Sequence, residues 1–345
     1  MEEINNKYHI SISNEISYWE NHVLGKWLEI NPNFNCPNCN KNSLKLFKNK
    51  KSLANPFLLK CNKKACRKKV NLREGTFFGI HKKIPISVII KIIEYFILDN
   101  KNAVQIGNAI INFYQLDSIN MKLIYSILTN VRKYLAQYLK EVYMYPLVEA
   151  NKSEYVAVDE SLFCHTNMNE QIWLIGLINT RNKNFRLEAV TRRDGDILQR
   201  IIRQHIGTGN NVVTDGWGAY NWMNSVNSGF NRIIHIHGQH DFGYGEQSTS
   251  HIESVWSDLK QKLSAFYVAV REENFILFVK EMEWRMKISH KNNIEKIKNL
   301  QFIFNHVANT VKYDLFTLEE LKDYEKLDYQ FEDDELSEDS EEIDL

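Results

Sequence analysis

The chain has 345 residues, of which 43% are hydrophobic, and it carries 43 basic and 43 acidic side chains. This length and apolar content are enough for a substantial core spread over two or three domains. No apolar run approaches the roughly 20 residues that a membrane-spanning helix needs, so the sequence argues against a membrane protein and predicts a soluble intracellular one.

The zero net charge hides two unlike regions. Residues 331–345 contain nine acidic side chains and no basic one, which predicts a disordered acidic tail or, as the alternative, a segment that masks a basic surface. The rest of the chain carries 43 basic against 34 acidic side chains, a formal charge of +9. A field of this sign attracts nucleic acid, which is therefore the expected class of partner.

Two pairs of cysteines lie within residues 31–80, after a predicted N-terminal helical segment over residues 1–30. They are Cys36 and Cys39, then Cys61 and Cys66. Cysteine pairs separated by about twenty residues are typical of structural zinc, and the metal substitutes for a core that this polar stretch lacks. We therefore predict a zinc ribbon with one Zn²⁺ bound by the four thiolates. Cys164 stands alone and is expected to be an ordinary buried or half-buried residue.

The predicted ribbon is strongly basic. Between residues 31 and 70 there are eleven lysine or arginine residues and no acidic residue. These cations favour contact with phosphates, because each such contact strengthens nucleic-acid binding in a salt-dependent way. The alternative is a ribbon that only braces its neighbours.

Helical periodicity runs from Ile84 to Lys140, with apolar residues three or four positions apart. It predicts two long helices on either side of a shorter one around Ala103–Ile111, in a helical region that spans residues 81–148. Three helices of which the last contains Arg132 and Lys133 are compatible with a helix-turn-helix that places its last helix in a DNA groove. A plain helical bundle linking two domains is the alternative.

From residue 149 to residue 300 the pattern becomes α/β. The expected order is three strands, a helix, a strand, a short helix, a strand and then longer helices. The strands are predicted at Tyr155–Val158, Gln171–Ile178, Phe185–Val190, Val212–Thr214 and Arg232–Ile236, and the helices at Ile197–Ile206, around Tyr220–Val226, and after Ser250 and Glu272. A C-terminal extension, residues 301–330, separates this domain from the tail.

Three acidic residues fall in a fixed order in this region. Asp159 and Asp215 each follow a short apolar strand, and Glu253 lies in the opening turn of the helix after Ser250. On a helical wheel, Glu253 sits at the margin of the buried stripe and shares its face with Lys260, two turns further on. Taken singly, each residue has an ordinary alternative as a turn former, helix cap or surface charge.

Taken together, the three carboxylates predict a site for two divalent metal ions. Oxygen ligands suit Mg²⁺ or Mn²⁺, and two such ions roughly 3.5–4 Å apart activate an attacking oxygen and stabilise a departing one on phosphorus. The expected metal ligands are Asp159, Asp215 and Glu253.

These motifs, in their order, resemble the DDE transposases of the Merlin type and their bacterial insertion-sequence relatives. The resemblance extends over residues 35–290. It includes the cysteine ribbon and Gly75-Thr76-Phe77-Phe78 with Ile84-Pro85, Val158-Asp159-Glu160, Thr214-Asp215-Gly216 with Ala219-Tyr220, Ile252-Glu253-Ser254-Val255-Trp256 with Leu259-Lys260, and Glu283-Trp284-Arg285.

The resemblance implies an RNase H-like catalytic domain with a mixed five-stranded sheet and flanking helices. In that fold the positions that match Asp159, Asp215 and Glu253 bind two Mg²⁺ ions, and the lysine that matches Lys260 approaches DNA. The implied activity is cutting and joining of double-stranded DNA at the terminal inverted repeats of a mobile element. The implied partners are these repeats and target DNA, and the expected active form is a homo-oligomer.

One motif departs from the family. Relatives usually carry His-Thr-Asn/Gln-Thr before the glutamate, whereas this chain has Ser248-Thr249-Ser250-His251. Two alternatives stay open: a zinc-ribbon DNA-binding protein without catalysis, and a two-metal nuclease without strand transfer. The expected location is the nucleus in a eukaryotic host, and otherwise the cytoplasm with the nucleoid.

Overall fold

The computed structural model describes residues 35–48, 54–74, 76–165, 171–235, 245–264 and 272–310, with positions 15, 17 and 52. The predicted segment 1–30, apart from two positions, and the predicted acidic tail lie outside the described residues. The chain divides into two compact units. The first comprises Met1–Tyr134, Lys291–Tyr313 and Tyr329–Leu345, and the second comprises Leu135–His290 and Asp314–Asp328.

The first unit contains a small antiparallel sheet in the order β1-β2-β3. Its strands are β1 (Leu44–Lys48), β2 (Phe57–Cys61) and β3 (Lys69–Val70). Side chains alternate across β2, so that Phe57, Leu59 and Cys61 are buried. The register pairs Cys61 with Leu44, which brings the end of β2 next to the start of β1.

Helices form the rest of the described part of the first unit, as the apolar periodicity predicts. They are η2 (Phe77–Gly79), α3 (Ile86–Ile97), α4 (Ala103–Tyr114), the first part of α5 (Met121–Val142), and α9 (Asn293–Thr310). Asn102 and Gln105 form a capping box that starts α4, and Gln115 ends it in the left-handed conformation. The short helix therefore begins at the predicted residue and runs slightly past the predicted end.

The second unit is built on a mixed five-stranded sheet in the order β6-β5-β4-β7-β8. The strands are β4 (Tyr155–His165), β5 (Gln171–Asn179), β6 (Phe185–Val190), β7 (Asn211–Thr214) and β8 (Asn231–Ile234). The first three pair antiparallel, whereas β7 pairs parallel with both β4 and β8. This order and these directions are those of an RNase H-like sheet, so the predicted fold class is confirmed.

Helices connect and cover these strands. They are α6 (Gly195–His205), η3 (Gly218–Asn224), η4 (Val226–Ser228), η6 (Gly245–Gln247), α7 (Ser250–Ser264) and α8 (Glu272–Lys287). Because β7 is parallel to β4, the chain must cross over the sheet between β6 and β7, and α6 makes this crossover. Among the described residues, no helix combines the length and the apolar character needed to cross a membrane.

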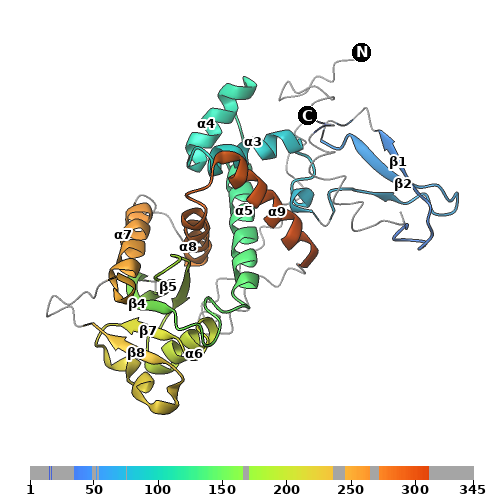
Figure 1. Ribbon diagram of the computed structural model, residues 1–345. Helices are drawn as coiled ribbons and strands as arrows, with labels where there is room; N and C mark the ends of the chain where they lie inside the picture. Colours follow the sequence, from blue (N-terminus) through green and yellow to red (C-terminus); the bar gives the residue numbers. More distant parts are fainter. Residues whose placement is uncertain are drawn as a thin grey trace. The chain divides into compact units, whose positions relative to one another are not determined.

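Helices lie on both faces of the larger sheet (Figure 1), and a hydrophobic core lies on each face. One joins the sheet to α7 and α8 through Ala157, Leu174, Ile252, Trp256 and Phe278. The other joins it to α6 and η3 through Val156, Val158, Leu198, Ile202 and Tyr220. Neighbouring residues of a strand point to opposite faces, so Asp159 continues the α7 side of β4 and Glu160 continues the α6 side.

Helix α8 is fixed in the second unit through a fully buried carboxylate. Glu283 accepts from Lys287 at 2.8 Å and from the Tyr143 hydroxyl, and Lys280 lies 3.4 Å away. Burial alone would raise the pKa of Glu283, but the charges of Lys287 and Lys280 and the hydrogen bonds from Lys287 and Tyr143 outweigh burial and hold this pKa below its ordinary value. The Glu283-Trp284-Arg285 motif thus contributes a buried ion cluster to this unit.

Candidate active site and cysteine cluster

Asp159 lies inside a strand and not at its end. The sequence predicts a strand that stops at Val158, but β4 continues to His165 and pairs Asp159 with Gly176 of β5. The expectation is wrong because the following residues keep their backbone partners on β5, with a register shift only after Leu162. On its other side β4 pairs with β7 only as far as Ala157, so Asp159 projects where that neighbouring strand gives way to a loop.

Asp215 follows β7 directly, as the sequence predicts. The parallel register sets Ala157 beside Val213, and the same register two residues further on brings Asp215 alongside Asp159. The backbone N–H of Trp217 donates to Asp215 Oδ1 at 2.9 Å, which holds the carboxylate in an Asx turn.

Arg232 of β8 holds the loop that carries Asp215. Its guanidinium donates to Thr214 Oγ1 (3.0 Å), to the carbonyls of Asp215 (3.0 Å) and Trp217 (3.3 Å), and to Oδ1 of Asn221 (3.1 Å) and Asn224 (3.4 Å). A guanidinium has five N–H donors, so this set uses nearly all of its capacity. No sequence pattern indicates this role, because the backbone, hydroxyl and amide oxygens that accept from Arg232 come together only in the folded loop.

A glycine makes room for the helix that covers Asp159. A Cβ atom on Gly176 would lie 2.5 Å from Ile252 Cδ1 and 2.7 Å from the Trp256 ring, so only glycine lets α7 pack this closely on β5. From this position Trp256 donates its Nε1–H to Asp159 Oδ2 at 2.8 Å. Trp256 therefore packs in the core and also orients the acid.

Glu253 lies in the first turn of α7, as predicted, and is half-buried. It accepts a hydrogen bond from Thr249 Oγ1 at 3.3 Å. The two serines of the departing motif bind each other, with Ser248 Oγ 2.7 Å from Ser250 Oγ and also accepting the Ser250 N–H at 3.1 Å. The Ser-Thr-Ser sequence thus caps the start of α7 and supports the carboxylate through Thr249.

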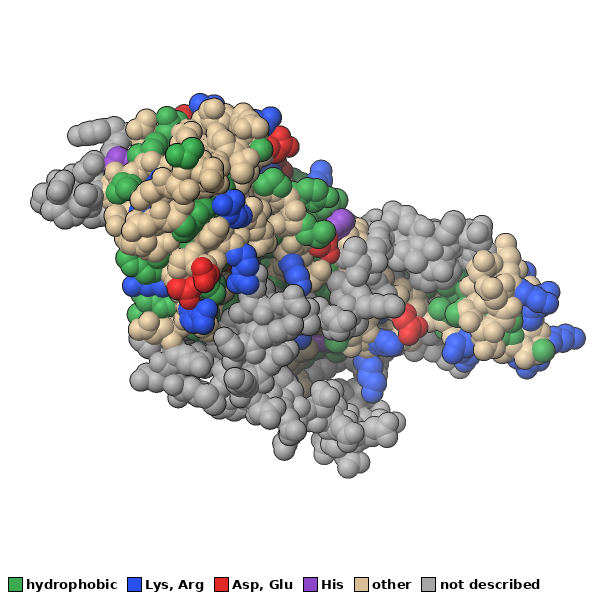
Figure 2. All heavy atoms as spheres, turned by 90° about the horizontal axis from the view of Figure 1, so that it is seen from below, with side chains coloured by type: hydrophobic (Ala, Val, Ile, Leu, Met, Phe, Trp, Pro, Cys, Tyr) green, Lys and Arg blue, Asp and Glu red, His purple; other side chains and the backbone are tan. Residues whose placement is uncertain are grey.

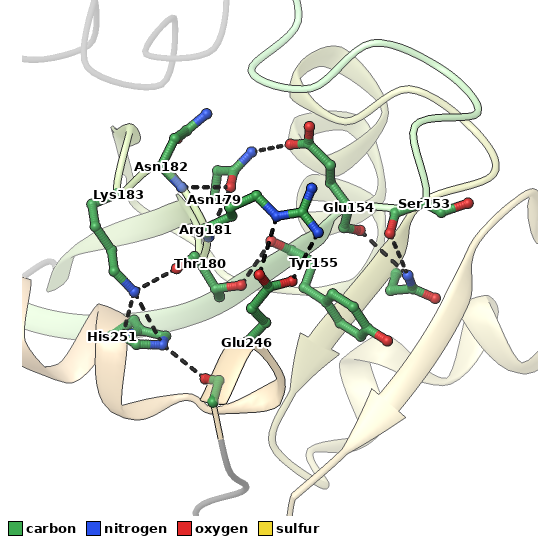
Figure 3. Close-up of polar contacts among 12 residues, drawn as sticks. Ser153, Glu154, Tyr155, Asn179, Thr180, Arg181, Asn182, Lys183, Glu246 and His251 are labelled. Carbon is green, nitrogen blue, oxygen red and sulfur yellow. Dashed lines mark hydrogen bonds and ion pairs between the residues drawn. The ribbon is translucent and has the colours of Figure 1, made fainter.

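The start of α7 is tied to the loop between β5 and β6 (Figure 3). Arg181 Nε donates to Glu246 Oε1 at 3.1 Å. Lys183 Nζ lies 3.1 Å from His251 Nδ1, and His251 Nε2 donates to the Gly245 carbonyl at 3.0 Å. These exposed contacts join both sides of the η6–α7 junction to the loop between β5 and β6, and so they fix the position of the first turn of α7 relative to the sheet.

Lys260 is an exposed residue of α7 and lies near Phe163, towards the end of β4. Its Nζ is 5.6 Å from the centre of the Phe163 ring, on the α7 side of the sheet. Within the described residues Lys260 makes no ion pair, so its ammonium group is available to a negatively charged ligand.

The three acids influence one another electrostatically. Burial raises the pKa of Asp159 most, the negative charges of Asp215 and Glu253 raise it further, and the hydrogen bond from Trp256 lowers it. Three carboxylates from three separate elements therefore share one region of negative potential. They do not close around one point: in the described part of the chain, only the four cysteines form a group of three or more such ligands placed to share a single ion.

A fourth acid, Glu160, lies on the opposite side of β4. Its carboxylate accepts the Tyr220 hydroxyl and lies 3.8 Å from Arg193 Nη1. Burial raises the pKa of Glu160 to about 7, and the charges of Asp159 and Asp215 add to the effect. Glu160 directly follows Asp159 in the sequence, but only the alternation of a strand that continues past Val158 shows that it faces Tyr220.

The four predicted cysteines come together in the first unit. All are free thiols, and their Sγ atoms lie within 4.8 Å of one another. The Cys36–Cys66 and Cys39–Cys61 sulfur distances are 3.6 and 3.8 Å. Tetrahedral zinc with Zn–S bonds of about 2.3 Å requires sulfur atoms about 3.8 Å apart, so this donor set fits zinc.

Local contacts prepare these thiols. Asn38 Nδ2 donates to Cys66 Sγ at 3.2 Å, and this hydrogen bond is the largest influence that lowers the pKa of Cys66 to about 6. The residue after the second cysteine of each pair, Asn40 and Arg67, is left-handed, with φ of 50° and 48°. Both pairs therefore sit in tight turns that present their sulfur atoms to the same point.

Basic side chains surround the cysteine cluster. Lysine and arginine side chains of the ribbon lie on its surface, and Figure 2 draws the basic side chains of the described residues in blue. The exposed ones are Lys41, Lys45, Lys63, Lys64, Arg67, Lys68 and Lys69. This part of the chain therefore offers a positive surface.

Residues 164–287 match the family model described as an ISXO2-like transposase domain. The matched stretch contains Asp215, Glu253 and Lys260 and begins just after Asp159. This part of the chain is therefore similar to transposase domains of the insertion-sequence type. No curated protein matches the chain.

Similar solved structures come from retroviruses. A simian T-cell lymphotropic virus intasome bound to PP2A regulatory subunit B56 gamma is 16% identical, with a TM-score of 0.28 and coverage of 42% of this chain and 50% of that chain. The BIV integrase catalytic core is 17% identical (TM-score 0.27; 37% and 80%). The HTLV-2 integrase catalytic core with magnesium is 11% identical (TM-score 0.27; 41% and 87%). The chain thus spans about half the length of the first of these chains.

Proposed function

We propose that the protein is a DDE transposase that cuts and joins DNA at the terminal inverted repeats of a mobile element. Asp159, Asp215 and Glu253 would hold two Mg²⁺ or Mn²⁺ ions, which when bound activate an attacking oxygen and stabilise the departing one on phosphorus. Lys260 would bind a phosphate of the DNA strand as a point charge.

One observation carries this proposal: Asp159 is a largely buried carboxylate set beside two further acids. Burial and like charge both raise its pKa, so the protein spends stability to keep the three acids together. Divalent cations relieve such repulsion. Because Mg²⁺ usually takes only one or two protein carboxylates and completes its shell with water and phosphate oxygens, acids spread around a strand rim fit it better than a closed cage would.

The chain's own residues would position the reacting groups. Trp256 holds Oδ2 of Asp159, and the Trp217 N–H holds Oδ1 of Asp215. Thr249 holds Glu253. Each carboxylate thereby keeps a fixed direction before any ligand binds, which is the preorganisation that catalysis by charged groups requires.

The cysteine cluster would bind one structural zinc ion, and its basic surface would contact DNA phosphates. The combination of ribbon and carboxylate site supports the finer assignment to the Merlin type. Joining two element ends requires that two sites act together, so a homo-oligomer is the expected active form.

The test is cleavage and joining of plasmid DNA that carries the element ends, in Mn²⁺ or Mg²⁺. Asp159→Asn should reduce cleavage by about a thousandfold or more, because it removes a charge that the metals need. Asp196→Asn is the matched control. It is the same substitution at an exposed residue of α6, which is not one of the three acids.

The outcomes separate three functions. Joined products that disappear in Asp159→Asn support the transposase. Cut but never joined DNA supports a nuclease. Equal cleavage by Asp159→Asn and the parent, or DNA binding with no cleavage by the parent, would overturn the enzyme and leave a DNA-binding protein.

A further inference from the structure

Arg193, between β6 and α6, lies between two indole rings. Its Cζ is 3.8 Å from the ring centre of Trp173 and 4.3 Å from that of Trp217. A guanidinium is planar and stacks on aromatic faces, so contact on both sides fixes the plane of this side chain. The charge of Arg193 is therefore oriented before a ligand arrives.

The rings that hold Arg193 are themselves held. Trp173 on β5 donates Nε1–H to Gln171 Oε1 at 3.1 Å. Trp217 meets the Tyr220 ring edge-on, with centres 6.1 Å apart, and its backbone N–H binds the Asp215 carboxylate. The stack is thus connected to one of the proposed metal ligands through a single residue.

Arg193 has hydrogen-bonding capacity to spare. Its side chain is 38% exposed, and the carboxylate it approaches, Glu160, is 3% exposed and 3.8 Å away. Across the described residues, Arg193 makes this ion pair and the two stacking contacts but no hydrogen bond. Most of its five N–H donors therefore remain for a ligand.

A second arginine of the same region shows the contrast. Arg232 directs its donors into five protein acceptors around the Asp215 loop, and so has little left to offer. Arg193 is held by rings, which occupy its faces and leave its N–H edge unused. The N–H donors of Arg232 hold the loop, whereas those of Arg193 remain for an anionic ligand.

The position of Arg193 indicates which anion. Trp217 binds the Asp215 carboxylate through its backbone N–H, and Glu160 directly follows Asp159 in β4, so the stack lies on the α6 side of the sheet next to Asp215. Asp159 projects from the other side of β4 at the same rim. Phosphates of one DNA strand follow one another about every 3.4 Å along the helix axis. A strand with its scissile phosphate at the acids brings neighbouring phosphates to this rim.

We propose that Arg193, stacked between Trp173 and Trp217, binds a phosphate of the DNA strand that is cut. This phosphate neighbours the scissile phosphate in the same strand. The guanidinium edge matches two phosphate oxygens at once. Arg193 is then a positioning residue for the DNA and leaves the chemical step to the acids. This inference rests on the proposed function, because it requires DNA at the carboxylate site.

The experiment compares Arg193→Gln with Arg192→Gln in the full-length chain. Arg192 is the adjacent arginine, 65% exposed and paired with Asp194 at 3.1 Å, and it makes the same change of charge. Binding of a fluorescein-labelled DNA duplex is measured in Ca²⁺ over a series of salt concentrations. Arg193→Gln should weaken binding about tenfold and reduce the slope of log affinity against log salt by about 0.9, the value for one lost phosphate contact.

Arg193→Lys separates charge from geometry. It should keep the salt slope of the parent but bind several-fold more weakly, because an ammonium group does not make the planar two-point contact. This variant also decides the question if Arg193→Gln folds poorly.

Equal affinity and salt slope in Arg193→Gln and Arg192→Gln, with a parent that still cuts DNA in Mn²⁺, would overturn the role of Arg193 and leave the proposed function intact. An Arg193→Lys variant with the affinity of the parent would overturn the two-point contact. A parent that neither binds nor cuts DNA would overturn both proposals together.

Discussion

The cysteine cluster and the carboxylate site bring polar ligands together in opposite ways. The cysteines come from two short turns joined by one small antiparallel sheet, and their sulfur atoms already lie within 4.8 Å of one another. The carboxylates come from β4, the loop after β7 and the first turn of α7. Asp159 is held by the Trp256 indole of another element, whereas Asp215 and Glu253 are held by nearby donors, the Trp217 N–H and the Thr249 hydroxyl.

The difference shows where each site obtains its stability. The ribbon has few buried apolar residues, so its ligands and the metal they fit would have to supply the folding energy. The carboxylate site rests on two hydrophobic cores that do not depend on an ion, so its acids need not close around a metal for the unit to fold. A closed site suits structure, and an open site suits chemistry.

The largest expected effect is the loss of the ribbon on removal of zinc. Structural zinc contributes about 10–16 kcal/mol in small domains at neutral pH, far more than this ribbon's core can replace. Treatment with 1,10-phenanthroline, or Cys61→Ser, should unfold the ribbon and allow trypsin to cleave after the lysines of residues 41–69. Mass spectrometry would map the cleavage sites. The non-chelating isomer 1,7-phenanthroline serves as the control.

If the comparison holds, the second unit should remain resistant to trypsin after the same treatment. Equal protection of residues 41–69 with and without zinc would mean that the ribbon folds by packing alone.

A change at Gly176 should do the reverse and affect the second unit alone. Gly176→Ala places a methyl group within 2.7 Å of the Trp256 ring and of Ile252, and such overpacking costs about 1–3 kcal/mol. Urea unfolding followed by tryptophan fluorescence would measure it. Gly218→Ala is the matched control, because its nearest contact would be 3.7 Å away and its effect should stay below about 0.5 kcal/mol.

An unchanged unfolding midpoint in Gly176→Ala would show that α7 is free to move away from β5. Zinc content should stay the same in both glycine variants.

The smallest expected effect is on the direction of one carboxylate. Trp256→Phe keeps a ring in the core but removes the Nε1–H that binds Asp159, and loss of such an orienting hydrogen bond costs about tenfold or more in metal affinity or activity. Cleavage rate as a function of Mn²⁺ concentration is the measurement, and the variant should need more metal.

Trp222→Phe provides the comparison for this prediction. Among the described residues, Trp222 Nε1 has no hydrogen-bond partner. Removing this N–H should therefore leave the dependence of the cleavage rate on Mn²⁺ unchanged. The same Mn²⁺ dependence in both tryptophan variants would contradict the orienting role of Trp256.

Much of the fold could be predicted from local patterns. Apolar periodicity located the helices of the first unit and the order of strands and helices in the second, because these patterns depend on residues a few positions apart. The one clear error, the end of β4, arose because strand length depends on a partner: β5 supplies backbone contacts to the residues after Asp159, and nothing in the β4 sequence records it.

The clustering of the four cysteines could be predicted from their spacing, since two cysteine pairs need only turns to bring their sulfur atoms together. The sequence also named Asp159, Asp215 and Glu253 as candidates. Three relations appear only in the folded chain. Gly176 leaves room for the Trp256 ring, Arg232 directs its donors to the Asp215 loop, and Arg193 lies between two indole rings without making a hydrogen bond to a described residue. These relations join residues far apart in the chain, and they depend on strand register and close packing, which no local pattern specifies.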